Sequence, residues 1–330
     1  MLKRVPPDQV RMGMYVHGFE GSWFDHPFWR SAFRIETEAD LARIRQCTAS
    51  AVLVDMKLSA DAAPRAPVAA AAPIRPIPRP LPHRPPKPEG PCSEAEEIVR
   101  ATKLLARSRA TVTRMFTDAR LGKSVNPHRA AKLVEEITAS VLRNRNALIG
   151  VVRLKSRHEY TYLHSVAVCA LMINLAREIG LDGSLFHEIG MAGLLHDLGK
   201  MAIPVAVLDK PGRLSDDEFV TIRSHPERGA EFLRDTKGVP AVALDVCLHH
   251  HEKYDGTGYP HGLSAEAISL YARMGAICDV YDAVTSDRAY KDAWTPEEAI
   301  ARMRSWEGHF DPLLLESFVR SLRRDGVAIG

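Results

Sequence analysis

The arrangement of apolar and polar residues differs between the start of the chain and the rest of it. Two short β-type runs, residues 14–16 and 51–54, flank a stretch over 37–46 whose apolar residues recur at helical spacing. Thr37 stands where a helix-capping residue is expected. This combination predicts a small α+β domain over residues 1–58.

A proline-rich segment follows this domain. Residues 59–92 are rich in Pro and Ala, and the stretch 64–91 holds eleven of the 22 prolines of the chain. Proline lacks a backbone N–H donor and fixes φ, so the segment cannot join a helix or a central strand. We expect an extended linker, with a docking motif for a proline-binding partner as the alternative.

From residue 93 onward the apolar spacing is helical, and no alternation of strands and helices occurs. Ser93 followed by Glu96 predicts a capping box, and Asn126–Pro127 predicts a second helix start. Further starts are predicted at Ser215, Thr295 and Asp311.

These signals predict the organisation of the rest of the chain. Two helices are expected, one to about residue 120 and one to about residue 146, and together they form a helical hairpin over 93–150. An all-α domain is expected over 151–330. The predicted fold class is therefore multidomain, with an all-α domain preceded by a small α+β domain and a proline-rich linker.

Composition excludes several classes of protein. Apolar residues make up 45% of the 330 residues and charged residues 26%, which is typical of a globular protein. The net charge of +3 argues against a general nucleic-acid binder. The 5 cysteines are scattered and never form a CxxC pair, so neither a disulfide framework nor a cysteine zinc site is expected. This use of cysteine predicts a cytoplasmic protein. The N-terminus does not have the pattern of a signal peptide, and without a run of about 18 apolar residues no integral membrane segment is expected.

Histidine is the unusual residue in this chain. Nine of the 14 histidines lie between residues 158 and 261. His164 and His196 both fall on apolar helix faces, so their imidazole rings are expected to point inward. Burying several imidazoles and carboxylates without partners would cost several kcal/mol each, so they must be paired or bound to metal.

The types of these side chains indicate which metals they would bind. Imidazole and carboxylate without thiolate suit Fe, Mn, Ni or Zn. The candidate ligands exceed what a single ion can use, and paired ions bridged by a carboxylate are a recurring device for hydrolysing phosphate esters.

The residues from 158 to 312 resemble the HD-GYP domain, the cyclic-di-GMP phosphodiesterase branch of the HD metal-dependent phosphohydrolases. The matching strings are YTYLHS (160–165), HDLGK (196–200), HPERG (225–229), HHEKYDGTGYP (250–260), DVYDA (279–283) and TSDRAYK (285–291). Residues 1–58 resemble a small domain of unassigned function that often precedes such domains, which suggests a regulatory role.

The resemblance implies a binuclear metal site with Asp197 as the bridging carboxylate. The implied metal ligands are His164, His196, Asp197, His225, His250, His251 and Asp279. The implied cofactors are two divalent transition-metal ions per chain, with Fe or Mn favoured over Ni or Zn.

The chain departs from the family pattern at one position. Some members hold a third ion with a glutamate four residues before the first motif histidine, where this chain has Tyr160. We therefore expect two ions. Glu159 or His158 could reach the centre only if the segment before Tyr162 is not helical.

The resemblance also implies an activity, which is hydrolysis of cyclic-di-GMP to linear pGpG by a hydroxide that bridges the two ions. Cleavage onward to GMP stays open. Asp197, Lys200 and Asp282 are the implied catalytic residues, with Lys200 on the scissile phosphate and Asp282 orienting a water. The implied substrate-binding residues are Lys200, Gly258, Tyr259, Arg288 and Lys291. His249 lies just outside the family string and is expected to have a structural or second-layer role.

Other functions stay open beside this enzyme. The chain could be a catalytically silent cyclic-di-GMP sensor or an HD phosphohydrolase for another cyclic nucleotide. It could also be a docking module that binds diguanylate cyclase (GGDEF) domains through the predicted turn at residues 258–260. A homodimer is open as well, and no nucleic-acid partner is expected.

Overall fold

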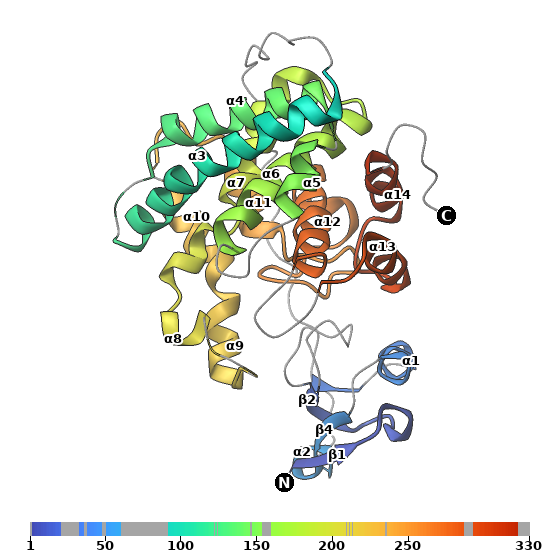
Figure 1. The fold of residues 1–330 in the computed structure, drawn as a ribbon. Coiled ribbons are helices and arrows are strands. Elements are labelled where there is room, and N and C mark those ends of the chain that lie inside the picture. Colours follow the sequence, from blue (N-terminus) through green and yellow to red (C-terminus); the bar gives the residue numbers. More distant parts are fainter. Residues whose placement is uncertain are drawn as a thin grey trace. The chain divides into compact units, whose positions relative to one another are not determined.

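The structure is a computed structural model. It describes residues 2–20, 33–35, 38–47, 51–60, 92–121, 123, 125–145, 147–153, 160–208, 210, 212, 214–234, 236–286 and 293–322. The chain divides into two compact units, Met1–Ile74 and Arg75–Gly330, and each is described by itself (Figure 1). The division at residue 58 and the separate helical hairpin stay predictions.

The first unit is built on a four-stranded antiparallel sheet in the order β1-β4-β2-β3. Its elements are β1 (Leu2–Val5), η1 (Pro7–Gln9), β2 (Tyr15–Glu20), β3 (Phe33–Arg34), α1 (Glu38–Gln46), β4 (Ala51–Asp55) and α2 (Met56–Ala60). The pairing of β2 with β4 shifts register between Val16 and Gly18. The predicted α+β class of this unit is confirmed.

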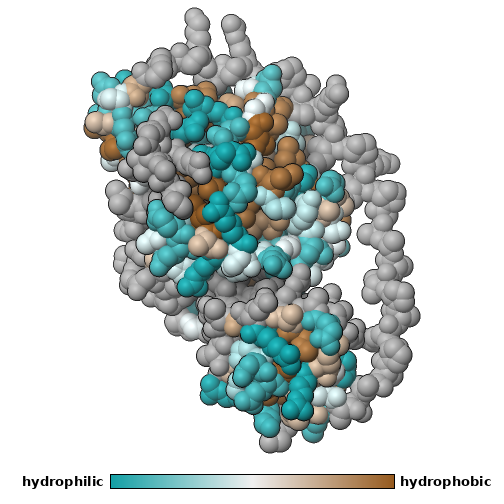
Figure 2. Space-filling view, turned by 90° about the vertical axis from the view of Figure 1, so that its right-hand side faces the viewer, coloured by the Kyte–Doolittle hydropathy of each residue, from teal (hydrophilic) through white to brown (hydrophobic). Residues whose placement is uncertain are grey.

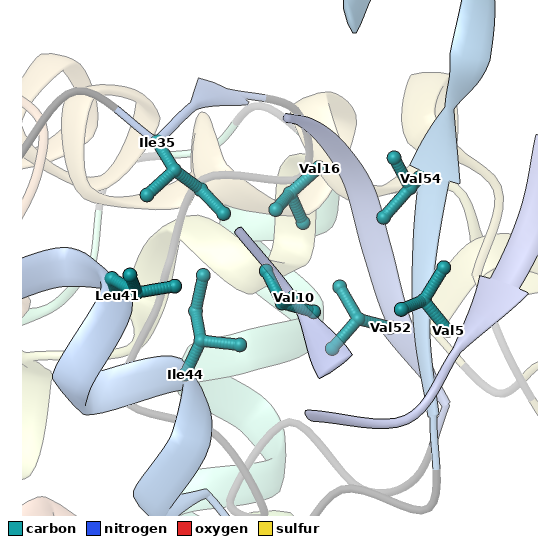
Figure 3. Packing of buried hydrophobic residues seen from close by; sticks show 8 residues of the cluster. All are labelled: Val5, Val10, Val16, Ile35, Leu41, Ile44, Val52 and Val54. Carbon is teal, nitrogen blue, oxygen red and sulfur yellow. The ribbon is translucent and has the colours of Figure 1, made fainter. Parts of the chain in front are cut away.

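Aliphatic side chains from the sheet, from α1 and from the segments beside them form the core of this unit (Figure 3). The members are Val5, Val10, Val16, Ile35, Leu41, Ile44, Val52 and Val54. Val52 and Val54 alternate along β4 and are fully buried, because successive side chains that face the same side of a strand are two residues apart. The core therefore lies between one face of the sheet and α1.

In its described part, the second unit is helical, which confirms the predicted all-α class. Its α-helices are α3 (Glu94–Arg120), α4 (Pro127–Arg143), α5 (Ala147–Arg153), α6 (Tyr160–Glu178), α7 (Phe186–Leu195), α8 (Val205–Leu208), α9 (Asp216–Arg223), α10 (His225–Arg234), α11 (Ala241–His249), α12 (Leu270–Val284), α13 (Pro296–Ser305) and α14 (Pro312–Ser321). The 3-10 helices are η3 (Gly183–Leu185), η4 (Leu198–Ala202) and η5 (Ala265–Ala267).

Most of the predicted helix starts are confirmed by their caps. Reciprocal capping boxes form at Ser93, Ser215 and Thr295, each with the Glu three residues later. Asn126 and Asp311 accept hydrogen bonds from backbone N–H groups of the helices that they precede. Thr37 lies outside the described residues.

One helix ends earlier than its sequence pattern predicts. α4 stops at Arg143 rather than near residue 146, because Asn144 adopts an extended conformation with φ −151° and ψ 111°. The Asn144 side chain then accepts a hydrogen bond from the backbone N–H of Ala147, 3.2 Å away, where α5 begins. The side chain of Asn144 thus bonds the backbone of the next helix, and α4 ends instead of continuing.

Two glycines allow close contacts that position the residues around 196–200. A Cβ atom on Gly193 would lie 2.7 Å from Cα of Cys169, so only glycine lets α7 approach the backbone of α6 this closely. A Cβ atom on Gly199 would lie 1.8 Å from the carbonyl oxygen of His225. These contacts bring the end of α7, η4 and the start of α10 together.

The apolar faces of the helices in the second unit turn mainly inward. In the coloured part of this unit in Figure 2, hydrophilic residues surround smaller hydrophobic patches. The long helix α6 is buried over most of its length, including Val166, Ile173 and Leu175. Among the described helices, none is long and apolar enough to cross a membrane.

Candidate metal centre

The structure brings together all seven side chains that were predicted as metal ligands. They form two groups, within each of which one ligand atom per residue lies within 4.8 Å of the others. The first ligand group is His164, His196 and Asp279; the second ligand group is Asp197, His225, His250 and His251. Six of the seven residues are buried, and His251 is half-buried.

Five elements supply these residues. His164 lies on α6 and Asp279 on α12, each within a helix that crosses the interior. The other ligands lie at helix ends: His196 and Asp197 follow α7, His225 begins α10, and His250 and His251 follow α11. Helix ends let side chains from different directions meet at one point.

Asp197 lies between the two groups. Its Oδ1 is 3.3 Å from Nε2 of His225 and 3.7 Å from Nε2 of His250. Its Oδ2 is 3.3 Å from Nε2 of His196 and 3.5 Å from Nε2 of His164. Each carboxylate oxygen therefore faces a different group, which is the arrangement that a bridging carboxylate requires.

The imidazole rings are held so that Nε2 faces the centre. Nδ1 of His196, His225 and His250 donates to a backbone carbonyl oxygen three or four residues earlier, at 2.9, 2.8 and 2.9 Å. Such bonds fix the ring orientation and the tautomer of a ligating histidine. Nε2 of each ring therefore faces the centre and is the atom that would bind a metal ion.

His164 is held by a carboxylate instead of a carbonyl group. Its Nδ1 donates to Oδ2 of Asp282 at 2.8 Å, and both side chains are only 2% exposed. Its Nε2 lies 3.1 Å from Oδ1 of Asp279. The structure thus places Asp282 behind a predicted ligand; the role of orienting a water stays a prediction.

Charge at the centre is strongly perturbed. Burial lowers the pKa of His164, but Asp197, Asp279 and Asp282 outweigh burial and raise that pKa to about 10. The same competition between burial and the carboxylates of Asp197 and Asp279 raises the pKa of His196 to about 9. Burial raises the pKa values of Asp197 and Asp279, but neighbouring cationic groups outweigh burial and lower both well below their ordinary value. The groups are Lys200 and His196 for Asp197. For Asp279 they are His164 and His196.

The donors fit a pair of divalent transition-metal ions. Nε2 of His196 and Oδ1 of Asp197 are buried and have no hydrogen-bond partner within the described part of the chain. Buried polar atoms without a partner are rare in native proteins unless an ion or water satisfies them. Imidazole with ionised carboxylate, and no thiolate, is a donor set for Fe, Mn, Ni or Zn.

Lys200 lies at the edge of the centre. Its Nζ contacts Oδ2 of Asp197, and 26% of its side chain is exposed. The contact is made across the start of η4, one turn along the chain. The ammonium group is therefore close to the predicted bridge, on a side chain that is partly exposed.

The turn Gly258–Tyr259–Pro260, here called the GYP turn, packs directly against the second ligand group. A Cβ atom on Gly258 would lie 2.3 Å from the backbone nitrogen of Lys253, so the turn needs glycine for this approach. The Tyr259 ring is 5% exposed and stacks on the ring of His251, with centroids 4.8 Å apart. Gly258 thus serves the packing of the turn, and contact of either residue with a nucleotide stays a prediction.

Arg223 is a residue that sequence reasoning missed. Its guanidinium carbon lies 4.4 Å from the centroid of the Tyr259 ring. Arg223 ends α9, two residues before the predicted ligand His225. Its position two residues before a motif histidine was the one sequence feature that pointed to a place beside the centre.

His249 belongs to neither ligand group. Its Nδ1 lies 2.8 Å from Oδ1 of Asp245, and its Nε2 lies 3.1 Å from Nδ1 of His261. Asp245 also accepts a hydrogen bond from the hydroxyl group of Ser269 at the start of α12. The side chain therefore links α11 to the chain after the GYP turn.

Four residues considered for the metal centre or the substrate contacts lie outside the described residues: His158, Glu159, Arg288 and Lys291. The chain on either side of 287–292 is described, and the backbone N–H of Trp294 donates to the carbonyl oxygen of Val284 at 2.9 Å. The predicted substrate-binding roles of Arg288 and Lys291 stay predictions.

Comparison with known proteins identifies two families along the chain. Residues 140–314 match the family model described as HD domain. Residues 2–130 match a domain of unknown function, DUF3391. The second match extends beyond residue 58 into α4.

Two curated relatives and one solved structure are similar to this chain. A cyclic di-GMP phosphodiesterase of Pseudomonas aeruginosa is 52% identical over 98% of this chain and 77% of its own length. The cyclic di-GMP phosphodiesterase response regulator RpfG of Xanthomonas campestris pv. campestris is 44% identical over 44% of this chain and 39% of its own length.

The solved structure supports the fold alone. It is Bd1817, an HDG"Y"P protein from Bdellovibrio bacteriovorus, which is 20% identical, covers 68% of this chain and 72% of its own, and has a TM-score of 0.56. The family match over half of the chain and the relative at 52% identity agree with the two ligand groups and the GYP turn. The chain therefore belongs to the HD domain family, in its HD-GYP phosphodiesterase branch.

Proposed function

We propose that this chain is a phosphodiesterase that hydrolyses cyclic-di-GMP at the two ligand groups. The observation that carries the proposal is the position of Asp197, whose two carboxylate oxygens each face one group at 3.3 Å. The substrate is inferred from the relatives, two of which are named cyclic di-GMP phosphodiesterases.

Each ligand group is proposed to hold one divalent ion, with Fe or Mn favoured and Ni or Zn as alternatives. Such a pair of ions supplies an activated water and stabilises negative charge on the phosphoryl oxygens. The protein's part is to keep seven donors in place before substrate arrives. The hydrogen bonds that Nδ1 donates do this for four of the histidines.

Lys200 is proposed to contact the scissile phosphate. Its ammonium group contacts Asp197, so an anionic group bound at the centre would lie within its reach. A lysine positioned before substrate binds stabilises developing charge without reorganising during the reaction. Gly258, Tyr259, Arg288 and Lys291 are proposed to contact the rest of the nucleotide.

The finer features of the function belong to the same proposal. The product is linear pGpG, and cleavage onward to GMP is a second step to be tested. The enzyme is cytoplasmic in this proposal, because its substrate is an intracellular signalling nucleotide. Docking of diguanylate cyclase (GGDEF) domains through the GYP turn and formation of a homodimer are further hypotheses.

The test is incubation of the purified, Mn- or Fe-loaded chain with cyclic-di-GMP, followed by chromatography of the nucleotides. We expect pGpG to accumulate with the wild type and not with Asp197→Ala. Absence of hydrolysis in the loaded wild type would exclude the enzyme, and tight binding without turnover would indicate a sensor. Faster cleavage of a cyclic dinucleotide with other bases would reassign the substrate.

A further inference from the structure

We infer that Glu252 is a positioning residue for the second ligand group, because it holds the GYP turn, and this turn in its place holds the ring of His251. The inference rests on the proposed function, since it concerns one of the two proposed ions. Glu252 directly follows the predicted ligands His250 and His251. It is only 2% exposed, and it was absent from the predicted site residues.

The carboxylate of Glu252 binds the chain that follows the GYP turn. Its Oε1 accepts a hydrogen bond from the backbone N–H of His261 at 2.7 Å, and its Oε2 accepts one from the backbone N–H of Leu263 at 3.0 Å. Hydrogen bonds to a carboxylate are stronger than those between neutral groups. One buried side chain therefore joins the chain before the turn to the chain after it, with each oxygen on a different backbone amide.

Backbone contacts hold the turn itself against the same part of the chain. The backbone N–H of Tyr259 donates to the carbonyl oxygen of His251 at 3.2 Å. A Cβ atom on Gly258 would lie 2.4 Å from Cα of Glu252, so the turn lies directly on the backbone of Glu252. The turn is thus held by the carbonyl group of His251 within it and by the carboxylate of Glu252 after it, which fixes where the Tyr259 ring lies.

The Tyr259 ring in turn orients a predicted metal ligand. It stacks on the ring of His251, with centroids 4.8 Å apart and an angle of 21° between the ring planes. Nε2 of His251 lies 3.2 Å from Nε2 of His225, within the second ligand group. The other four histidines of the centre are oriented through Nδ1 by hydrogen bonds. A ring stacked on its face gives His251 a corresponding support, because rotation of the imidazole would break that contact.

The experiment measures metal binding by the wild type, Glu252→Gln, His251→Ala, the double variant of these two, and Glu266→Gln. Glutamine keeps the shape of glutamate but has one acceptor oxygen, so it can accept from only one of the two backbone N–H groups. Glu266→Gln is the matched control, because Glu266 is an exposed glutamate of the same loop that accepts a hydrogen bond from the Tyr254 hydroxyl at 3.2 Å. Each metal-free protein is titrated with Mn against a chelating dye, and hydrogen exchange is measured over residues 258–263.

We expect Glu252→Gln to exchange faster over residues 258–263 and to bind one ion about 10-fold more weakly, the lower end of the loss that follows removal of a ligand's support. The other ion should keep its wild-type affinity, and Glu266→Gln should match the wild type. His251→Ala should weaken the same ion, and Glu252→Gln should add no further loss to it, because Glu252 acts through His251. Faster exchange with wild-type affinity for both ions overturns the inference, and so does an additive loss in the double variant.

Circular dichroism separates this role from a general effect on folding. If Glu252→Gln does not fold, Glu252→Asp, which keeps both oxygens on a shorter side chain, is measured in the same way. Failure of both variants to fold, or equal weakening of both ions, overturns the inference in favour of a structural role. The titration needs no nucleotide, so a wild type that binds two ions without hydrolysing cyclic-di-GMP would exclude the proposed function alone. A wild type that binds fewer than two ions would overturn the inference about Glu252.

Discussion

Replacement of Asp282 by asparagine tests how the first ligand group is held. Oδ2 of Asp282 accepts a hydrogen bond from Nδ1 of His164 at 2.8 Å, and both side chains are 2% exposed. Asparagine has nearly the same volume as aspartate but no charge. Asp282→Asn therefore weakens the contact with His164 without opening a cavity.

The expected loss follows from the burial and charge of this contact. A hydrogen bond to a charged group contributes about 1.5–3 kcal/mol, which corresponds to about a 10- to 150-fold change in an equilibrium constant. Loss of a carboxylate behind a ligating histidine typically costs about 10- to 100-fold in metal affinity or activity. Because His164 belongs only to the first ligand group, one ion should be weakened by this factor and the other retained.

The assay is titration of metal-free protein with Mn in competition with a chelating dye, with elemental analysis as a second measure. Asp245→Asn is the matched control. Oδ1 of Asp245 also lies 2.8 Å from Nδ1 of a histidine, but that residue, His249, belongs to neither ligand group. We expect the control to bind both ions with wild-type affinity.

Two results would refute this reasoning about Asp282. Wild-type affinity for both ions with a large loss of kcat would show that Asp282 acts on a water, as the family resemblance implies. Equal weakening of both ions would show that the two ligand groups do not bind metal independently.

Four other predictions test the centre from different sides. Asp197→Ala should deplete both ions and abolish hydrolysis while leaving a helical circular dichroism spectrum, since each oxygen of Asp197 faces one group; wild-type turnover would contradict the bridge. Arg288→Ala and Lys291→Ala should keep both ions and lose about 1.5–3 kcal/mol of nucleotide-binding free energy, as measured by calorimetry. Loss of metal in either variant would show that its predicted substrate-binding role is wrong. His164 and His196, with pKa values of about 10 and about 9, are protonated in the metal-free chain near neutral pH. Metal binding should therefore release about two protons, and metal affinity should increase as pH rises toward 9. Calorimetry in two buffers of different ionisation enthalpy measures this proton release, and no release would contradict the prediction. Elemental analysis with anomalous diffraction should find two ions per chain, and a third ion held by residue 158 or 159 would show that prediction to be wrong.

Local signals in the sequence were sufficient to predict much of the helical framework. The capping boxes at Ser93, Ser215 and Thr295 form as expected, because each is completed by residues only three positions apart. The end of α4 was not predictable in this way. The apolar spacing of the sequence allows the helix to continue through Asn144. The hydrogen bond from the backbone of Ala147 to the Asn144 side chain depends on where α5 begins.

The sequence also indicated which residue types meet at the site. Nine of the 14 histidines fall in one stretch, and the motif strings named seven candidate ligands that the structure brings together. Neither spacing nor resemblance divided them into two groups. That division depends on which oxygen of Asp197 faces which imidazole, and therefore on how η4 and α10 pack around Gly199.

Only the tertiary structure decided what lies behind and beside the ligands. Asp282 and His164 are 118 residues apart, so their contact depends on the packing of α12 against α6. The stacking of Arg223 on Tyr259 likewise depends on how α9 and the GYP turn fold onto the second ligand group. A local pattern determines which face of a helix is buried, whereas the partner of a buried polar group is set by whichever distant element fills the space next to it.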